Sequence, residues 1–277
     1  MARGRPTLVK FGGELLEEPQ RLRRIARTLV GAAQRGPVIV VHGGGREVDA
    51  EMARVGLRKQ AVDGLRITTA ESLEIVLGVL AGRVNTRLVA ALQRAGGQAV
   101  GLTGVDAGTT TVNRARRYRA TDGSSVDLGF VGVPTGLGEP VLIRDLTRLG
   151  YIPVVASIAA DEGGRLFNVN ADSLAGDLAS RTKASELVIV GTTAGVLNAD
   201  GRTIPVLPDD DQGVGALIRD GQASAGMVAK LLACRVALDG GVRRVAIVDG
   251  TRRMFLDTTG DTGVTRVTST RAEKRPK

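Results

Sequence analysis

Apolar residues along the chain follow two alternating patterns, one typical of buried strands and one typical of helices. Runs of strand length occur at Thr7–Phe11, Pro37–Val41, Ala99–Leu102, Ile152–Ala156, Leu166–Val169, Glu186–Val190 and Val242–Val248. Between these runs apolar residues recur every three or four positions, as they do at Leu73, Val76, Leu80, Val84 and Leu88. Similar spacing predicts helices at 22–29, 48–55, 141–149 and 227–238, and one that begins at Ala171. This alternation predicts an α/β sandwich, in which helices cover a mainly parallel sheet.

One segment and the chain end depart from this rhythm. Residues 109–134 are rich in Thr, Arg, Asp and Gly and contain the turn signal Asp122-Gly123, which predicts a β-hairpin insertion. The polar, basic tail from Arg266 is expected to fray. Since no linker or repeat interrupts the chain, we expect a single domain over 1–277. Its N-terminal lobe would cover about 1–178 and its C-terminal lobe about 179–277, joined near Ala175–Lys183.

The composition favours a compact protein with an aliphatic core. Hydrophobic residues make up 43% of the 277 positions, whereas aromatic residues make up 2% and tryptophan is absent. Cys234 is the only cysteine, which excludes an intramolecular disulfide and suits a reducing compartment. The apolar runs are of strand length, and no signal-peptide pattern opens the chain. We therefore expect a soluble cytoplasmic protein with no membrane span.

The net charge of +9 raises the question of nucleic-acid binding. The densest basic cluster combines four arginines with a single aromatic residue, and its members are Arg114, Arg116, Arg117, Tyr118 and Arg119. No recognisable nucleic-acid motif accompanies this cluster, and the other arginines are scattered. The charge is better explained by a solvated basic surface that attracts anionic nucleotides or metabolites.

Lysine is rare in this chain, and two lysines lie close to glycines. Only six of the 38 basic residues are lysine. Lys10 precedes Gly12-Gly13 directly after an apolar run, and Lys230 follows Gly226 by one helical turn. Ammonium groups beside glycine-rich turns suit a phosphate-binding site, because backbone N–H groups approach the phosphate oxygens there. A tight turn with a surface lysine is the alternative for Lys10.

A second glycine cluster follows the next predicted strand, in the sequence His42-Gly43-Gly44-Gly45. Three consecutive glycines suit a loop in which the backbone approaches an anion closely. His42 is the only histidine, so the chain has few residues from which to build a Ser-His-Asp triad or a metal site of several histidines. For His42 itself, packing at a strand end is favoured over a catalytic role.

Two further motifs carry polar groups that suit an acidic substrate. Arg66, which follows the turn Asp63-Gly64, can bind a carboxylate through two parallel hydrogen bonds, although a surface role is the alternative. Asn168 and Asn170 alternate on one strand and point to the same side, and Asp172 follows them in the first turn of a helix. Helix capping by Asn170 and Asp172 is the alternative here, and it leaves Asn168 free to contact a ligand.

Taken in order, these motifs resemble those of the amino acid kinase superfamily, and within it those of the N-acetylglutamate kinases. The resemblance runs from Leu8 to about Val248. It implies a three-layer sandwich around an eight-stranded, mainly parallel sheet, with the amino-acid substrate on the N-terminal lobe and the nucleotide on the C-terminal lobe. It also implies ATP-dependent phosphorylation of the side-chain carboxylate of N-acetyl-L-glutamate to an acyl phosphate, in arginine biosynthesis.

The resemblance also assigns roles to residues. Lys10 and Lys230 would stabilise the transferring phosphoryl group, and Asp172 would orient the two lysines. The substrate N-acetylglutamate would be held by Gly44, Gly45, Arg66 and Asn168. The nucleotide would contact Gly12, Gly13, Thr192, Thr193, Gly195, Leu197, Gln222, Ser224 and Gly226. Mg²⁺ would be held mainly by the ATP phosphates, with no dedicated protein metal site.

The chain departs from the family pattern at three places. Gly191-Thr192 stands where family members often carry Ser/Thr-Asp, and the segment 261–265 matches the usual ending poorly. Only about six residues precede the first predicted strand, so the chain resembles the shorter, arginine-insensitive kind, which is a homodimer. The long helix at about 70–94 carries more apolar surface than one sheet face needs, which suits a dimer contact.

Two alternatives remain open at this stage. One is a kinase that acts on glutamate or 2-aminoadipate attached to a small acidic carrier protein, which a basic chain would suit. The other is a non-catalytic nucleotide-binding protein on the same fold. Release of ADP in the presence of N-acetylglutamate would separate these readings.

Overall fold

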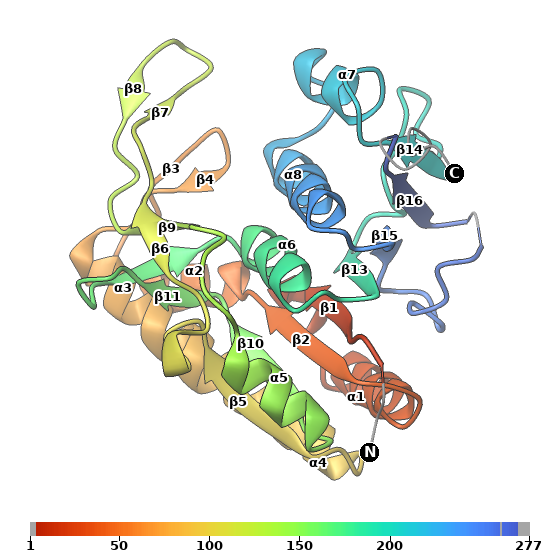
Figure 1. Ribbon diagram of the computed structural model, residues 1–277. Coiled ribbons are helices and arrows are strands. Elements are labelled where there is room, and N and C mark those ends of the chain that lie inside the picture. The colour runs from red at the N-terminus through yellow and green to blue at the C-terminus, as the bar shows by residue number, and fades with distance from the viewer. Residues whose placement is uncertain (1–3, 261, 271–277) are drawn as a thin grey trace.

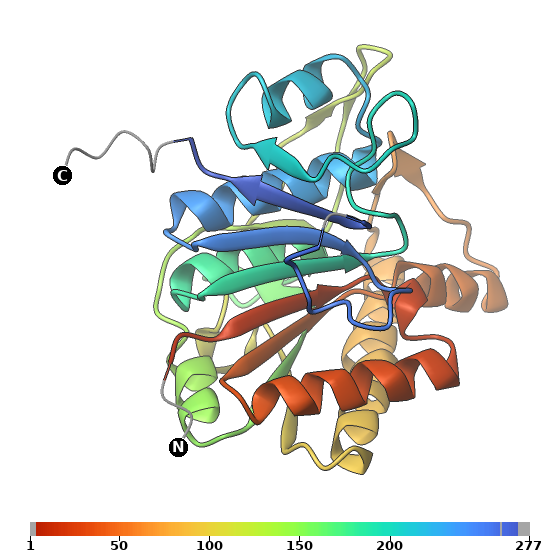
Figure 2. The ribbon, with the colours of Figure 1, turned by 90° about the vertical axis from the view of Figure 1, so that its right-hand side faces the viewer.

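The structure is a computed structural model that describes residues 4–260 and 262–270. Its centre is an eight-stranded sheet (Figures 1 and 2). The strands lie in the order β14 (Val206–Pro208), β16 (Val264–Thr268), β15 (Arg244–Asp249), β13 (Glu186–Gly191), β1 (Thr7–Phe11), β2 (Val38–His42), β10 (Ile152–Ala156) and β5 (Ala99–Thr103). Every neighbouring pair is parallel except β15 and β16, which are antiparallel. The predicted mainly parallel sheet is confirmed.

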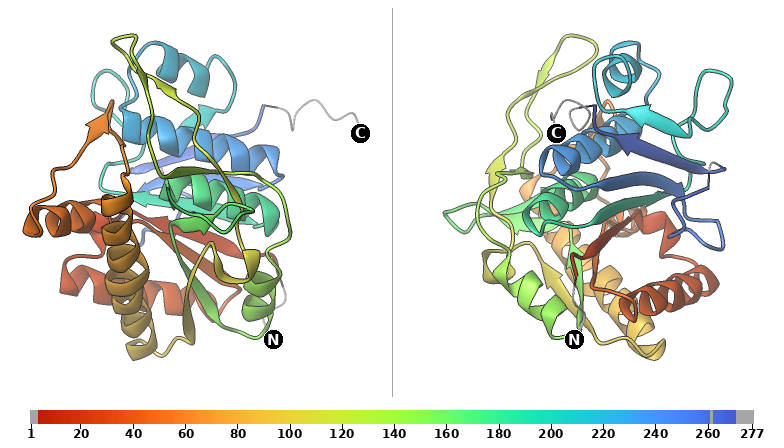
Figure 3. Two further views of the ribbon diagram at one scale, coloured as in Figure 1. Left: turned by 90° about the vertical axis from the view of Figure 1, so that its left-hand side faces the viewer. Right: turned by 45° about the vertical axis from the view of Figure 1, so that its right-hand side comes forward.

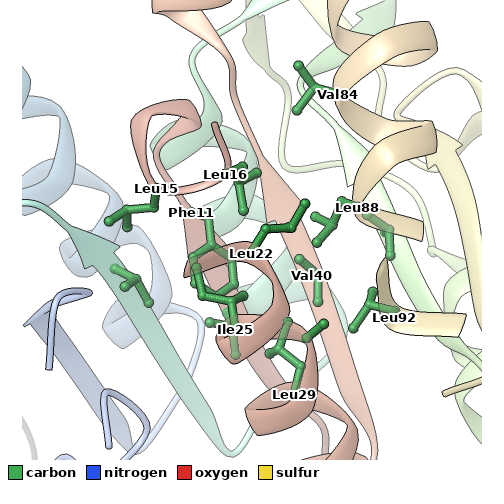
Figure 4. Packing of buried hydrophobic residues seen from close by; sticks show 14 of the residues in the cluster. Phe11, Leu15, Leu16, Leu22, Ile25, Leu29, Val40, Val84, Leu88 and Leu92 are labelled. Atoms are coloured by element: carbon green, nitrogen blue, oxygen red, sulfur yellow. The ribbon is translucent and has the colours of Figure 1, made fainter. Parts of the chain in front are cut away.

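Helices cover both faces of this sheet and complete the expected three layers. One face packs against α1 (Pro19–Ala33) and a long helix formed by α3 (Ala70–Leu77), the π-helical segment η2 (Gly78–Val84) and α4 (Asn85–Arg94). The other face packs against α5 (Val141–Arg148), α6 (Ala171–Arg181) and α8 (Ala225–Asp239). Because successive side chains of a strand point to opposite faces, Val9 and Phe11 join the first core and Leu8 joins the second. Figure 4 shows Phe11 packed among side chains of α1 in the first core.

A smaller sheet and two hairpins lie beyond the carboxyl ends of the central strands (Figures 1 and 3). The smaller sheet has the order β11 (Ile158–Ala160), β12 (Leu166–Val169), β9 (Val131–Pro134) and β6 (Val112–Arg114). The hairpins are β3–β4 (Ala61–Val62 and Leu65–Arg66) and β7–β8 (Tyr118–Arg119 and Ser125–Val126). The predicted hairpin insertion is thus confirmed. Asp63 joins the two hairpins, because its carboxylate accepts hydrogen bonds from the N–H and Oγ1 of Thr121 at 2.8 and 2.9 Å.

The expectation that the chain frays from Arg266 is wrong for the residues the structure describes. β16 continues through Thr268 and pairs with β15, and its residues Val264 and Val267 are buried. The two apolar residues of this polar segment were too few to predict a strand from the sequence. The strand is stabilised by pairing with β15, which lies in another part of the chain. Asp261 and residues 271–277 lie outside the described part. The remaining elements are η1 (Gly13–Leu15), α2 (Gly45–Arg54), η3 (Asp106–Gly108) and α7 (Val214–Arg219).

The helix Ala70–Arg94 is the one described helix that is long and apolar enough to cross a membrane, with a mean hydropathy of 1.5. Length and composition alone give this match, and a core helix passes the same test. Val76, Leu80, Val84 and Leu88 are buried against the first core, so one side of this helix is core surface. The other side holds half-buried apolar residues together with exposed charged ones such as Glu74 and Arg83. The apolar helix that the sequence predicts at about 70–94 is confirmed.

Candidate active site

Two glycine loops meet beside the centre of the sheet. Lys10 pairs with Val41 and Phe11 with His42 in the parallel ladder, so β1 and β2 end side by side. The loops Gly12-Gly13 and Gly43-Gly44-Gly45 follow these ends. A side chain on Gly13 would collide with the backbone of Gly44, which explains why glycine is required at this contact. Both loops line a cavity of about 500 Å³.

A buried ion pair lies at the floor of this cavity. The Nζ of Lys10 lies 2.8 Å from Oδ1 of Asp172, and only 6% and 7% of their side-chain surfaces are exposed. Asp172 is held at the N-terminus of α6, where Oδ1 of Asn170 accepts hydrogen bonds from the N–H groups of Asp172 and Ser173. Of the predicted capping by Asn170 and Asp172, the part of Asn170 is confirmed, whereas the carboxylate of Asp172 faces Lys10 instead. The ammonium and the carboxylate are close enough to orient each other inside a region with little water.

Lys230 approaches the same cavity from the C-terminal half of the chain. It lies one turn into α8, and its Nζ donates a hydrogen bond to the carbonyl of Gly226 at 3.1 Å. Burial lowers the pKa of Lys230, and attraction by Asp172 opposes this shift while Lys10 adds to it. Lys10, Asp172 and Lys230 line the cavity together, so the structure brings the predicted catalytic group into one place.

Arg66 and Asn168 also line the cavity, together with Gly44 and Gly45. The guanidinium of Arg66 forms an ion pair with Asp49 of α2 and donates a hydrogen bond to the carbonyl of Gly45 at 3.2 Å. Since 14% of its side chain is exposed, the alternative of a surface role for Arg66 is wrong. On β12, Nδ2 of Asn168 donates a hydrogen bond to Oγ1 of Thr68 at 3.2 Å.

The residues expected at the nucleotide fall into two groups. Gly12, Gly13 and Gly226 line the cavity described above. The others lie outside its lining, in the loop after β13 and in the loop before α8, and they are Thr192, Thr193, Gly195, Leu197, Gln222 and Ser224. Local structure accounts for two of them. Gly195 has φ +73°, and a side chain there would collide with Thr265, while the side chain of Ser224 caps α8.

Two carboxylates of the cavity were missed by sequence reasoning. Asp49 lies one turn after Gly45 on α2, and Glu14 lies in η1 beside Gly12. The spacing of four residues from Gly45 was the available signal for Asp49, since it places both on one side of a helix. Among the described residues, no group of three His, Cys, Asp or Glu side chains is arranged to hold a metal ion.

This arrangement suits phosphoryl transfer to a carboxylate. Two ammonium groups can offset the charge of a phosphoryl group in transit, and free N–H groups of glycine loops can contact its oxygens. A carboxylate acceptor is ionised at neutral pH, so the reaction needs no general base. His42 fits that picture, because it is fully buried and the predicted packing role is confirmed.

Known acetylglutamate kinases are similar to this chain over most of its length. The acetylglutamate kinase of Heliobacterium modesticaldum is 39% identical over 258 residues, which are 89% of this chain and 85% of that protein. The chloroplastic acetylglutamate kinase of Arabidopsis thaliana is 37% identical over 256 residues, which are 92% of this chain and 72% of that protein.

Solved structures agree on the fold. N-acetylglutamate synthase from Neisseria gonorrhoeae, in complex with coenzyme A and N-acetyl-glutamate, matches with a TM-score of 0.79 and 25% identity. The match covers 96% of this chain but only 60% of that chain. Giardia carbamate kinase matches in fold alone, with a TM-score of 0.66, 15% identity and coverage of 97% and 100%. Residues 5–249 match the model of the amino acid kinase family, and the chain belongs to that family.

Proposed function

We propose that this protein transfers the γ-phosphoryl group of ATP to the side-chain carboxylate of N-acetyl-L-glutamate, as an acetylglutamate kinase of arginine biosynthesis. The observation that carries the proposal is the group Lys10, Asp172 and Lys230 beside two glycine loops. Relatives named acetylglutamate kinase, 37–40% identical over most of the chain, support the same activity. We place the enzyme in the cytoplasm, where the buried thiol of Cys234 stays reduced.

In the proposed reaction a carboxylate oxygen of the substrate attacks the γ-phosphorus. The new P–O bond forms the acyl phosphate, and the bond from the γ-phosphorus to the bridging oxygen breaks with its electron pair leaving on ADP. Lys10 and Lys230 offset the charge of the transferring group, and Asp172 keeps the Lys10 ammonium in place. N–H groups of Gly44 and Gly45 contact oxygens on the acceptor side.

The substrate contacts are proposed for the part of the cavity that is lined by Arg66 and Asn168. Arg66 would bind the α-carboxylate of N-acetylglutamate, and Asn168 would bind its polar groups. The nucleotide would extend from Gly12, Gly13 and Gly226 toward the two loops of the C-terminal half. Mg²⁺ would be held mainly by the phosphate oxygens of ATP, where it supplies charge neutralisation.

One assay tests the proposed function. The purified protein is mixed with ATP, Mg²⁺ and N-acetylglutamate, and ADP release is followed together with formation of a hydroxylamine-reactive acyl phosphate. Signal that depends on N-acetylglutamate supports the proposal. Signal only with a carrier-linked amino acid would identify the carrier-dependent kinase instead, and no signal with either would indicate a binding protein.

Arg66→Lys should raise the KM for N-acetylglutamate by about tenfold or more, with a small change in the KM for ATP. An ammonium cannot reproduce the two parallel hydrogen bonds of a guanidinium with a carboxylate. Steady-state kinetics with each substrate varied in turn measures both constants. Arg114→Lys, at an exposed arginine paired with Asp127, serves as the control. A rise confined to the KM for ATP would place Arg66 on the nucleotide instead.

We also propose that the protein is a homodimer formed through the long helix and the edge strand β5. The sheet ends at β5, and half-buried residues of the helix, Ala81 and Val89, line a groove of about 290 Å³ beside it. A second copy would cover this apolar surface. Light scattering should give twice the chain mass of 28.8 kDa, and Val89→Asp should reduce it. Leu149→Asp, at an exposed leucine on the other face, should leave it unchanged, and a wild-type monomer would contradict the proposal.

A further inference from the structure

Directly beneath the glycine loop, two buried polar side chains form a hydrogen-bonded chain. His42 is fully buried and 4% of Asn85 is exposed. Nδ1 of His42 lies 3.0 Å from the carbonyl oxygen of Gly43, and Nε2 lies 3.0 Å from Nδ2 of Asn85. Nδ2 of Asn85 also donates to the carbonyl of Val154 in the middle of β10, at 2.9 Å. The chain of contacts therefore runs from the central sheet to the first peptide of the loop.

The partners define the tautomer of His42. A carbonyl oxygen only accepts, so Nδ1 of His42 carries the proton that is donated to Gly43. Nε2 then accepts from the amide of Asn85, whose second hydrogen points to the carbonyls of Val154 and, at 3.4 Å, Leu102. Burial lowers the pKa of His42 to about 4, so the ring is neutral above this pH. Asn85 is thus the group that keeps His42 in the form that can hold Gly43.

The peptide between Gly43 and Gly44 transmits this contact to the cavity. No cis peptide bond occurs in the described residues, so the carbonyl of Gly43 and the N–H of Gly44 point in opposite directions. Because His42 binds the carbonyl from the buried side, the N–H of Gly44 faces away from the core. Gly44 lines the cavity beside the lysines, where such a donor can contact an oxygen of the acceptor or of the phosphoryl group.

The surroundings of Asn85 are shaped for this role. Asn85 directly follows the π-helical segment, whose residues Leu80 and Val84 pack against Gly44. A Cβ atom on Gly44 would lie 2.7 Å from the side chain of Leu80 and 3.2 Å from that of Val84. A side chain at Gly101 of β5 would collide with the amide of Asn85. A π-helical turn inside an α-helix is frequent at functional sites, since it changes which side chains face a neighbour.

We propose that Asn85 is a positioning residue for phosphoryl transfer: through His42 it holds the Gly43–Gly44 peptide so that the N–H of Gly44 is aimed into the cavity. This inference rests on the proposed function and adds a residue that touches neither substrate. Asn85→Leu, similar in volume but without donors, should lower kcat/KM for N-acetylglutamate by about tenfold or more, since loss of a well-placed oxyanion donor costs roughly 100-fold or more. The KM for ATP should change by less than about twofold, because most of the proposed nucleotide contacts lie in the loops after β13 and before α8.

A matched control removes the hydrogen bonds of a buried hydroxyl from the same helix. Ser72 is 3% exposed and its Oγ donates to the carbonyl of Thr69, outside the cavity, so Ser72→Ala should keep kcat/KM near the wild-type value. At His42, the amide nitrogen of an asparagine can take the place of Nδ1. His42→Asn should therefore retain more activity than His42→Leu, whereas a purely structural role would favour the apolar substitution.

The single histidine makes a second readout direct, because ¹⁵N spectra of the imidazole contain one ring only. The wild type should show the Nδ1–H tautomer, and Asn85→Leu a mixture of tautomers. Wild-type kcat/KM in Asn85→Leu would overturn the inference and leave the proposed function standing. An inactive wild type would overturn the proposed function, and the spectra then decide the inference: a mixture supports the hold on Gly43, and an unchanged tautomer overturns it.

Discussion

Replacing either cavity lysine by alanine should lower turnover by at least about 100-fold. Lys10→Ala removes the ammonium that faces Asp172, and Lys230→Ala removes the one at the start of α8. Each loss leaves charge on the transferring phosphoryl group without its counter-charge, in a site where water offers little replacement. Initial rates of ADP release at saturating ATP and N-acetylglutamate measure the effect. Thermal unfolding followed by circular dichroism shows whether each variant is folded.

Lys183→Ala is the matched control, because it removes a lysine that lies after α6 and outside the cavity lining. Its turnover should stay within about twofold of the wild type. Lys230→Arg adds a test of shape, since a planar guanidinium carries the charge but fills more of the cavity than an ammonium does. A folded Lys10→Ala or Lys230→Ala protein with near-normal turnover would remove that lysine from the proposed mechanism.

The second large effect is expected for Asp172→Asn, which should lower both stability and turnover. The substitution leaves the Lys10 ammonium buried without its partner, and breaking a buried ion pair in this way costs about 3–5 kcal/mol of unfolding free energy. Turnover should fall by about 100-fold, because Lys10 is no longer held toward the phosphoryl group. Urea unfolding and steady-state kinetics measure the two effects separately.

Asp172→Asn should also change the pH dependence of turnover. Burial lowers the pKa of Lys230, and attraction by Asp172 opposes that shift. Without the carboxylate the pKa should fall further, and the required ammonium should be lost at a lower pH. The alkaline limb of the activity profile should therefore move to lower pH. If the alkaline limb does not move, Lys230 is not the group whose deprotonation limits activity.

Asp177→Asn provides the comparison within the same helix. Asp177 forms an equally buried ion pair with Arg181, with side-chain exposures of 5% and 7%, and it lies outside the cavity lining. This variant should lose stability as Asp172→Asn does, but its residual folded protein should turn over at close to the wild-type rate. Equal losses of turnover in the two variants would mean that Asp172 acts through folding alone.

Much of the architecture could be predicted from local patterns. Strands such as Pro37–Val41 are apolar on both faces, and the helix stripe from Leu73 to Leu88 has the spacing of one buried side, so their types follow from periodicity alone. β16 and the short strands β3 and β4 were missed. A strand of few apolar residues is stabilised by its partners, and those partners lie elsewhere in the chain.

The same division holds at the candidate site. Lys10, Lys230 and the loop that contains Gly44 could be proposed from glycine spacing and the rarity of lysine, because these signals act within a few residues. For Asp172 the local pattern gave only a place in the first turn of a helix, and its role beside the lysines came from the family resemblance. Glu14 could not be placed in the cavity, since an isolated carboxylate in a polar segment has no local signature. Asp49 had only its four-residue spacing from Gly45 as a signal. Asn85 could not be recognised from the sequence for a related reason. An asparagine within a helix is common, and its role depends on its contact with His42 at the end of β2.

The sequence by itself determined the succession of strands and helices, the turns that require glycine and the chemistry of the motifs. Only the tertiary structure decided which of these meet. The parallel pairing of β1 with β2 brings the two glycine loops together, and the return of α8 places Lys230 near Asp172, more than fifty residues away along the chain. Such contacts depend on how whole helices and strands pack together. The free energy of that packing is a sum over many apolar side chains, so no single sequence motif predicts it.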